Sequence, residues 1–242
     1  MGQPWYSAGG DMNVALMIEA FPTILGGLPN TLMLAGISLV IGFLIATGVA
    51  LMRTSPNPIF AGTAYGFVYL FRSTPLLVQI FLIYYGSGQF RPALDSVGLW
   101  PFFREAWFCA LLALALNTGA YTSEIIRGGI QSVHVGQIEA AKAVGMSGLD
   151  TFRQIVFPQA LRQALPAYGN EIILMVKSTS LASTITILEV TGQAKKMIAS
   201  TFQPVEIFII AGGIYLTLNF IISRLITFGE RRLSPDRDRA GS

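Results

Sequence analysis

The chain has little charge and few residues that carry chemistry. Only 12% of its 242 residues are charged, 52% are hydrophobic, and the mean hydropathy is +0.58. Soluble domains carry about 25% charged residues, so this composition indicates a membrane protein rather than a soluble one. The net charge of +3 is small and dispersed, and basic residues do not alternate with aromatic ones. Nucleic acid is therefore not an expected partner.

The scarcity of cysteine and histidine argues against most enzyme classes. Cys109 is the only cysteine and lies in an apolar run, which favours simple burial and excludes an internal disulfide. His134 is the only histidine and has no acidic or cysteine neighbours at ligand spacing, so we expect a solvated loop residue and no metal site. An intramembrane enzyme would need a nucleophile–base pair or a metal cluster, and these two residues supply neither.

Long apolar stretches predict membrane-spanning helices, each of which needs about 20 mostly apolar residues. No Lys or Arg precedes Arg53, so we expect no secretory signal peptide, and no charge at all lies between Glu19 and Arg53. We predict an all-α integral membrane protein with a single domain over residues 1–242. Its five spans are expected at about 23–52, 59–86, 105–126, 166–188 and 205–228. The second span is interrupted at 71–75, and the fourth is expected to break near 177–180.

The distribution of basic residues predicts the orientation, because cytoplasmic segments carry an excess of Lys and Arg. With the N-terminus outside, Lys195 and Lys196 would face outward against this bias, together with two arginines. Nine basic residues would face the cytoplasm: Arg53, Arg127, Lys142, Arg153, Arg162, Arg231, Arg232, Arg237 and Arg239. We therefore expect an external N-terminus, a cytoplasmic C-terminus and a cytoplasmic loop at about 127–165.

The polar loop contains a short helix bounded by glycines. Gly136 and Gly145 bracket residues 137–144, about two helical turns in which several alanines keep the helix slim. Gly145 can end this helix with a positive φ. A second helix is expected to begin at 151–156, and Pro158 to interrupt it. A slim helix can enter a groove on a partner, but a solvated hairpin between two spans explains the same residues.

The spacing of this loop resembles the inner-membrane permease signature of ABC importers. Glu139-Ala140-Ala141 is followed by Gly145, Ile155 and Phe157-Pro158 at the family's intervals, with Phe157 where Leu is usual. FRSTPLLVQIFLIYYG (71–86), LNTGAYTSEIIRGGIQSVHVGQIEAAKAVGMS (116–147) and LPAYGNEIILMVKSTSLAS (165–183) resemble segments of polar amino acid permeases. ALPAYGNEIILM and STFQPVE look most like one partner of the two-permease histidine, lysine–arginine–ornithine and opine importers. The resemblance covers about 28–233.

The resemblance implies the permease subunit of a type I importer in a bacterial inner membrane, with a periplasmic N-terminus. Its substrates would be polar or cationic amino acids or opine-like derivatives. The implied partners are a second, non-identical permease subunit, two ATPase subunits, a periplasmic solute-binding protein and membrane lipid. This chain has no G-x-x-x-x-G-K-[ST] run, so ATP and Mg²⁺ would be bound by the ATPase and no cofactor by this chain. The implied contacts with the ATPase are Gln137, Glu139, Ala140, Ala141, Lys142 and Gly145.

Charges at membrane depth suggest a substrate pathway, because each costs at least ~2.5–3.5 kcal/mol on insertion scales. Glu171 and Ser178 are seven residues apart and can share a helix face. There a carboxylate can meet a substrate cation, while a hydroxyl or the Lys177 ammonium meets its carboxylate. Alternatively, Glu171 and Lys177 pair with each other or with a neighbouring span. The complete predicted pathway set is Asn117, Tyr121, Asn170, Glu171, Lys177, Ser178, Thr179 and Arg72.

For several of these candidates a purely structural role explains the sequence equally well. Arg72 can contact a substrate carboxylate or act as a snorkelling or interhelical anchor. Asn117 and Tyr121 share a face and can line a pore or hold helices together. Glu124 and Arg127 are expected to form a local ion pair. Gly26-Gly27 and Gly212-Gly213 are expected to allow close helix packing. A carrier or channel that works alone remains the alternative function, and it predicts flux without ATP.

Overall fold

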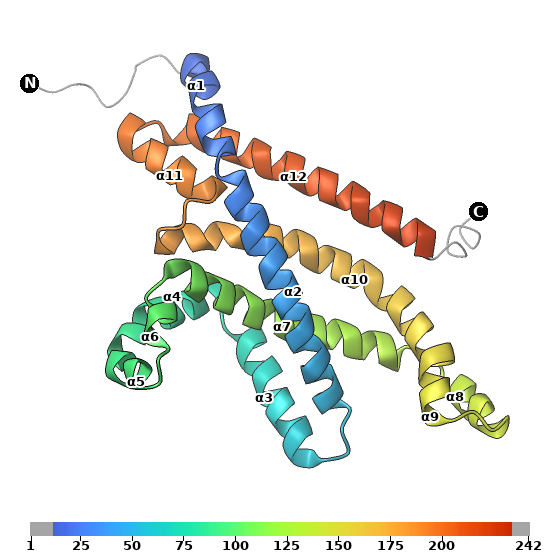
Figure 1. The fold of residues 1–242 in the computed structure, drawn as a ribbon. Coiled ribbons are helices and arrows are strands. Elements are labelled where there is room, and N and C mark those ends of the chain that lie inside the picture. Colours follow the sequence, from blue (N-terminus) through green and yellow to red (C-terminus); the bar gives the residue numbers. More distant parts are fainter. Residues whose placement is uncertain (1–11, 234–242) are drawn as a thin grey trace, which may run out of the picture.

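A computed structural model describes the backbone of residues 12–233 and the side chains up to residue 230, and this part of the chain is helical without strands (Figure 1). The α-helices are α1 (Val14–Leu25), α2 (Leu28–Arg53), α3 (Pro58–Ser73), α4 (Leu76–Ser87), α5 (Arg91–Ser96), α6 (Trp100–Phe103), α7 (Ala106–Gln131), α8 (Val135–Ala143), α9 (Gly148–Thr151), α10 (Phe157–Ser178), α11 (Val190–Thr201) and α12 (Pro204–Leu233). Residues Gly88–Phe90 and Thr179–Ile185 form 3-10 helix, and Phe152–Val156 forms a π-helical turn.

Three helical stretches among the described residues are long and apolar enough to cross a membrane: Val14–Arg53, Ala106–Gln131 and Pro204–Glu230. Two bent pairs meet the same criterion together. Pro58–Ser73 and Leu76–Ser96 meet at 102°, and Gly148–Ile185 and Val190–Thr201 meet at 43°. Counting each pair as one span gives up to five, so the predicted number fits the helices while the exact count stays a prediction.

Helix boundaries differ from the predicted spans where local chemistry breaks an apolar run. The first apolar stretch divides at Gly26 and Gly27, so α1 ends at Leu25 and α2 begins at Leu28. The fourth breaks within 177–180, as expected, because α10 ends at Ser178 and 3-10 helix follows. Thr186 then turns the chain with a φ of 74°.

Helix α7 is the central element and packs against α2, α3, α4 and α10. Its contact with α2 depends on two glycines. A Cβ on Gly42 would lie 2.2 Å from Thr118 Cγ2, and a Cβ on Gly119 would lie 2.9 Å from Ile45 Cγ2. Since real Cβ atoms do not approach so closely, glycine at these positions permits the short distance between the two helices.

A second core forms where α1, α11 and α12 meet, around Ile24, Val190 and Ile207. Gly27 contributes to this junction, because a Cβ there would lie 2.6 Å from the carbonyl carbon of Glu189 and from Val190 N. The expectation of close packing is thus confirmed for Gly27. Gly212 and Gly213 differ, since a Cβ on either would meet nothing within 4 Å in this chain.

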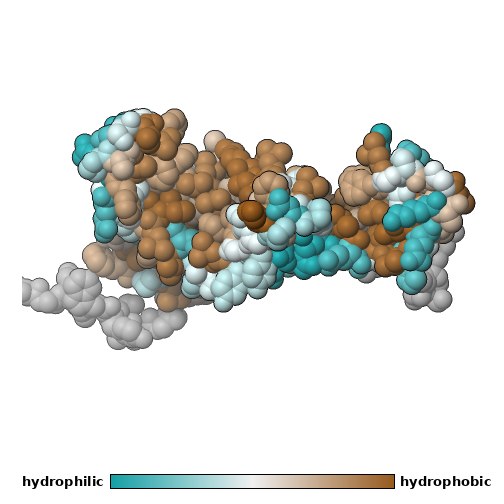
Figure 2. Space-filling view, turned by 90° about the horizontal axis from the view of Figure 1, so that it is seen from below, coloured by the Kyte–Doolittle hydropathy of each residue, from teal (hydrophilic) through white to brown (hydrophobic). Residues whose placement is uncertain are grey.

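Large apolar side chains cover much of the surface. Figure 2 shows one face, where hydrophobic residues predominate and hydrophilic residues gather in patches, one of them at the end that carries α8 and α9. Leu44, Leu82, Leu216 and Leu225 are each more than 65% exposed. Exposed apolar area on this scale requires lipid or another protein chain as its surroundings.

Candidate functional site

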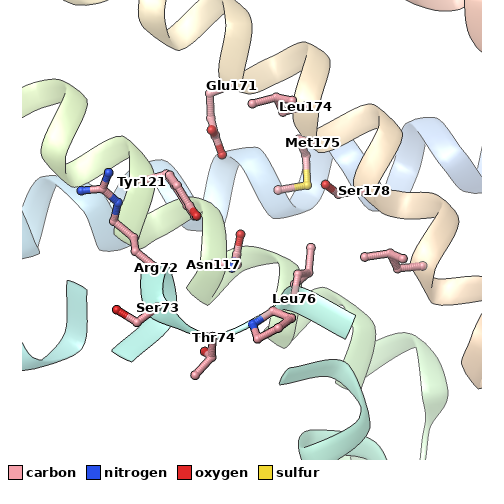
Figure 3. Close-up of a pocket in the computed structure, with 12 residues that line it drawn as sticks. Arg72, Ser73, Thr74, Leu76, Asn117, Tyr121, Glu171, Leu174, Met175 and Ser178 are labelled. Atoms are coloured by element: carbon pink, nitrogen blue, oxygen red, sulfur yellow. The ribbon is translucent and has the colours of Figure 1, made fainter. Parts of the chain in front are cut away.

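A pocket of about 470 Å³ lies where the break between α3 and α4 faces α7 and α10 (Figure 3). Its lining brings together five of the residues predicted for the pathway, which come from three separate parts of the chain: Arg72, Asn117, Tyr121, Glu171 and Ser178. Ser73, Thr74, Pro75 and several apolar residues complete it. Their role in transport stays a prediction, but the structure places them around one space.

The pocket exists because the second apolar stretch is broken rather than continuous. Thr74 and Pro75 adopt extended backbone, and Pro75 has no N–H with which to continue a helix. The break leaves backbone carbonyls of α3 without helical partners. Irregular backbone at membrane depth is tolerated where protein or a cavity surrounds it.

Two amide side chains supply hydrogen bonds to the broken backbone. Gln79 Nε2 donates to Phe71 O at 2.9 Å, to Thr74 O at 3.1 Å and to Thr74 Oγ1 at 2.8 Å. Asn117 Nδ2 donates to Gln79 Oε1 at 3.0 Å and to Phe71 O at 3.3 Å. Asn117 therefore holds α7 against the break while it lines the pocket. Sequence analysis missed Gln79, although a lone glutamine four residues after a proline in an apolar run is a usable signal.

The pocket contains one side chain of each charge. Glu171 is 7% exposed and accepts a hydrogen bond of 2.7 Å from Thr118 Oγ1 on α7. Arg72 makes a cation–π contact with Tyr121, since its guanidinium carbon lies 5.1 Å from the centroid of the ring. Within residues 12–230, neither Glu171 nor Arg72 belongs to an ion pair. Both charges are therefore available to a bound molecule.

The remaining predicted pathway residues lie elsewhere. Asn170 and Lys177 are exposed and do not line this pocket. Thr179 is buried, and its hydroxyl donates to Val176 O at 2.7 Å. Lys177 does not pair with Glu171, whose hydrogen bond comes from the neighbouring helix instead. For these three residues a place in the pathway stays a prediction without support from this pocket.

The predicted short helix in the polar loop is present as α8. His134 caps its N-terminus, where His134 Nδ1 accepts from Gly136 N at 3.1 Å, a role that sequence analysis missed. Gln137, Glu139, Ala140, Lys142 and Gly145 are exposed, whereas Ala141 is 5% exposed. Among the described side chains, Glu139 and Lys142 do not form an ion pair with each other.

The helix ends as its glycine predicts. Gly145 has a φ of 83°, and Met146 N donates to Ala141 O at 3.0 Å, the bond that characterises a Schellman motif. Gln159 Nε2 then donates to Gln137 Oε1 at 2.6 Å, which ties α8 to the start of α10. The result is a small helix with an exposed polar face, tied to α10 through Gln137.

The expectation that Pro158 interrupts the helix is wrong. Pro158 lies in the first turn of α10, directly after the π-helical turn Phe152–Val156, and α10 continues to Ser178. Proline is accepted in a first helical turn because its missing N–H would have no partner there. The polar loop is therefore joined rigidly to the helix that carries Glu171.

Comparisons with known proteins show the family of this chain. Residues 38–235 match the family described as binding-protein-dependent transport system inner membrane component. The chain belongs to this family. It is 65% identical over 231 residues to the nopaline transport system permease protein NocM of Agrobacterium fabrum, covering 95% of this chain and 96% of that protein. It is 40% identical over 216 residues to the arginine ABC transporter permease protein ArtM of Escherichia coli K12, covering 89% and 96%.

A solved structure supports the same assignment. The crystal structure of an amino acid ABC transporter with histidines matches with a TM-score of 0.82 and 36% identity over 92% of this chain and 99% of that chain. The chain is thus an ABC transporter permease with the type I fold, a multi-pass inner-membrane protein. It is a transport subunit rather than an enzyme, and ATP hydrolysis belongs to a partner.

The permease also carries an ion cluster at the end of α7 nearest α8. Glu124 and Arg127 form the expected local pair, with Arg127 Nη2 2.6 Å from Glu124 Oε2. The cluster includes a third charged residue, because Arg53 Nε on α2 lies 3.5 Å from Glu124 Oε1. Arg53 in turn lies over the ring of Tyr65 on α3. The local pair therefore also ties three helices together.

A buried carboxylate outside the pocket was missed by sequence analysis. Glu189 is fully buried and caps α11, where its carboxylate accepts from Gly192 N at 2.8 Å and from Thr191 N at 3.0 Å. Tyr215 on α12 donates to the same group at 2.5 Å. The signal was the position of Glu189 just before a helix, but Tyr215 is 26 residues away and no pattern connects them.

Proposed function

We propose that this permease forms half of the translocation pathway of an importer for cationic amino acids or opines, and that substrate passes through the pocket at the α3–α4 break. The observation that carries the proposal is the presence of Glu171 and Arg72, without ion-pair partners, in one pocket. The similar proteins named for nopaline and arginine transport support the substrate class.

Opposite charges on the substrate and the pocket would determine how the substrate binds. The Glu171 carboxylate would contact the cationic group of the substrate, and the Arg72 guanidinium would hold a carboxylate with two parallel hydrogen bonds. The break adds two weaker effects, because the C-terminal end of α3 carries partial negative charge and the N-terminal end of α4 partial positive charge. Broken helices serve this purpose at the binding sites of other membrane transporters.

Coupling would run through α8. We infer that Gln137, Glu139, Ala140, Lys142 and Gly145 contact an ATPase subunit, since these residues are exposed on a short helix fixed to the body by Gln159. Movement of α8 would reach Glu171 through the short turn at 144–147, α9, the π-helical turn and α10, and through the hydrogen bond between Gln159 and Gln137. Such motion would rock the helices and change the side to which the pathway opens.

The assembly would contain this permease, a second and non-identical permease, two ATPases that bind ATP and Mg²⁺, and a periplasmic solute-binding protein. The N-terminus would be periplasmic and the C-terminus cytoplasmic. In support, α8, α9 and the C-terminal end of α12 lie at the same end of α10, as Figure 1 shows. That end would then face the ATPase.

The substrate class can be tested with the complete transporter in proteoliposomes. The ATPase rate is measured with the solute-binding protein loaded in turn with arginine, octopine, nopaline and glutamate. The proposal predicts stimulation by arginine or an opine and none by glutamate. Stimulation by glutamate alone would contradict the role given to Glu171.

A further inference from the structure

Thr118 on α7 lies between two other helices. It is 1% exposed, its hydroxyl donates a hydrogen bond of 2.7 Å to Glu171 Oε1 on α10, and its methyl group lies against α2 at Gly42. Thr118 does not line the pocket that contains Glu171. Any effect of its hydroxyl on a bound substrate therefore has to pass through the carboxylate that it contacts.

The acceptor of the Thr118 hydroxyl is unusual for a helical threonine of this chain. Such a hydroxyl commonly donates to the carbonyl four residues earlier in its own helix. Several threonines of the described helices do so: Thr31, Thr47, Thr63, Thr74, Thr217 and Thr227. The hydroxyl of Thr118 crosses to α10 instead, and within residues 12–230 it makes no bond to its own helix.

The close approach of α2 and α7 explains this choice. A threonine in a helix divides between two rotamers, because its hydroxyl can bond either its own helix or another group. The observed side chain directs its methyl group toward α2 and its hydroxyl toward α10. A Cβ on Gly42 would lie 2.2 Å from Thr118 Cγ2, so glycine leaves the room that this rotamer needs.

Glu171 depends on Thr118 for its orientation. Among the described side chains its carboxylate accepts no other hydrogen bond and belongs to no ion pair. Thr118 holds Oε1, which leaves Oε2 for a ligand. Figure 3 shows the Glu171 side chain directed from α10 toward Asn117 and Tyr121, across the pocket. A side chain that is already fixed loses less conformational freedom when a ligand binds.

We propose that Thr118 is a positioning residue for substrate recognition. Its hydroxyl holds the Glu171 carboxylate in the orientation that receives the cationic group of the substrate, and Gly42 secures the rotamer of Thr118. The inference rests on the proposed function of the pocket. It makes the contact between α2 and α7 part of the recognition of a substrate that Thr118 and Gly42 do not touch.

Removing the hydroxyl while keeping a side chain of similar shape tests the proposal. Thr118→Val retains a methyl group at Gly42 and deletes the donor, whereas Thr118→Ser retains the donor. Thr122→Val is the matched control, because Thr122 is equally buried one turn further along α7 and its hydroxyl has no hydrogen-bond partner within the described structure. Affinity is measured by isothermal titration calorimetry on the complete purified transporter, without the solute-binding protein. The probe is whichever of arginine and nopaline binds the parent transporter more tightly.

We expect Thr118→Val to weaken binding about fivefold, which lies within the range for fixing one side chain in advance. Thr118→Ser and Thr122→Val should stay within about twofold of the parent, since neither removes a donor from Glu171. Equal or tighter binding in Thr118→Val would overturn the proposal. So would an equal loss in Thr122→Val, or a failure of Thr118→Ser to bind better than Thr118→Val.

A double-mutant cycle separates positioning from packing. On a Glu171→Gln background there is no carboxylate to position, so Thr118→Val should weaken binding by less than a factor of about two. An equal loss on both backgrounds would show that Thr118 acts through packing alone, which would overturn the proposal. If neither probe binds the parent, or if Glu171→Gln leaves binding unchanged, the proposed function itself fails. If Glu171→Gln weakens binding and Thr118→Val does not, this inference alone fails.

Discussion

Thr118 on α7 donates a hydrogen bond of 2.7 Å to the carboxylate of Glu171 on α10. This contact joins two helices that are 53 residues apart in sequence and holds one carboxylate oxygen in place. Because Glu171 lines the pocket and has no cationic partner in the described structure, its negative charge faces the proposed substrate path.

Glu171→Gln should weaken transport of a cationic substrate while the transporter still assembles. A charge-assisted hydrogen bond is worth about 1.5–3 kcal/mol, which corresponds to about a 10- to 100-fold loss of apparent affinity at about 1.4 kcal/mol per factor of ten. The measurement is concentration-dependent uptake of labelled arginine by proteoliposomes. Glu105→Gln is the control, since Glu105 is exposed and outside the pocket. Unchanged affinity in Glu171→Gln would make Glu171 a structural residue.

Gly145→Asp should leave membrane insertion intact and abolish ATPase association and uptake. A residue with a Cβ is strained at a φ of 83°, by roughly 1–2 kcal/mol, and the change also adds charge beside α8. Gly148→Asp is the matched control, because Gly148 has equally open space and lacks the positive φ. The readout is co-purification of the ATPase with each variant. Normal ATPase recovery with Gly145→Asp would argue against coupling through α8.

Gln79→Leu should destabilise the permease and impair uptake. The substitution removes the donor to Phe71 O and Thr74 O at the α3–α4 break, and a buried group left unpaired costs about 1–3 kcal/mol. Thermal unfolding in detergent should show a lower midpoint than the parent protein. Gln89→Leu is the control, since Gln89 is exposed. Equal midpoints for both variants would mean that the break does not depend on Gln79.

Gly42→Ala should also lower the unfolding temperature, because the added Cβ would lie 2.2 Å from Thr118 Cγ2. Overpacking of this kind costs about 1–3 kcal/mol. Gly48→Ala on the same helix is the control, since its Cβ would meet nothing within 4 Å and alanine favours helix. If Gly42→Ala unfolds at the same temperature as Gly48→Ala, α2 and α7 do not need glycine at their contact.

Local features of the backbone were predictable from the sequence because each depends on a residue at that position and not on contacts with distant segments. Gly145 predicted a helix end with positive φ, and the fourth span was expected to break near 177–180, where the structure has the change to 3-10 helix. The prediction for Pro158 was wrong because the effect of a proline depends on whether it lies inside a helix or in its first turn. The π-helical turn before α10 places Pro158 in the first turn.

Contacts between distant segments were not predictable. Glu171 was a candidate from its charge, but its partner Thr118 is an ordinary residue of an apolar helix. The link between Glu189 and Tyr215 likewise depends on how α11 and α12 pack. The separation of Lys177 from Glu171, in contrast, follows from helix geometry, because residues six apart point to different faces of α10.

ATP-driven transport is tested by measuring solute entry into vesicles that contain this permease alone or the complete transporter, with and without ATP on the ATPase side. Uptake of the labelled amino acid is expected only with the complete transporter and ATP, and it should be lost in Gly145→Asp. Entry of solute through this polypeptide alone, without ATP, would show that the chain is a carrier or channel and not a subunit coupled to an ATPase.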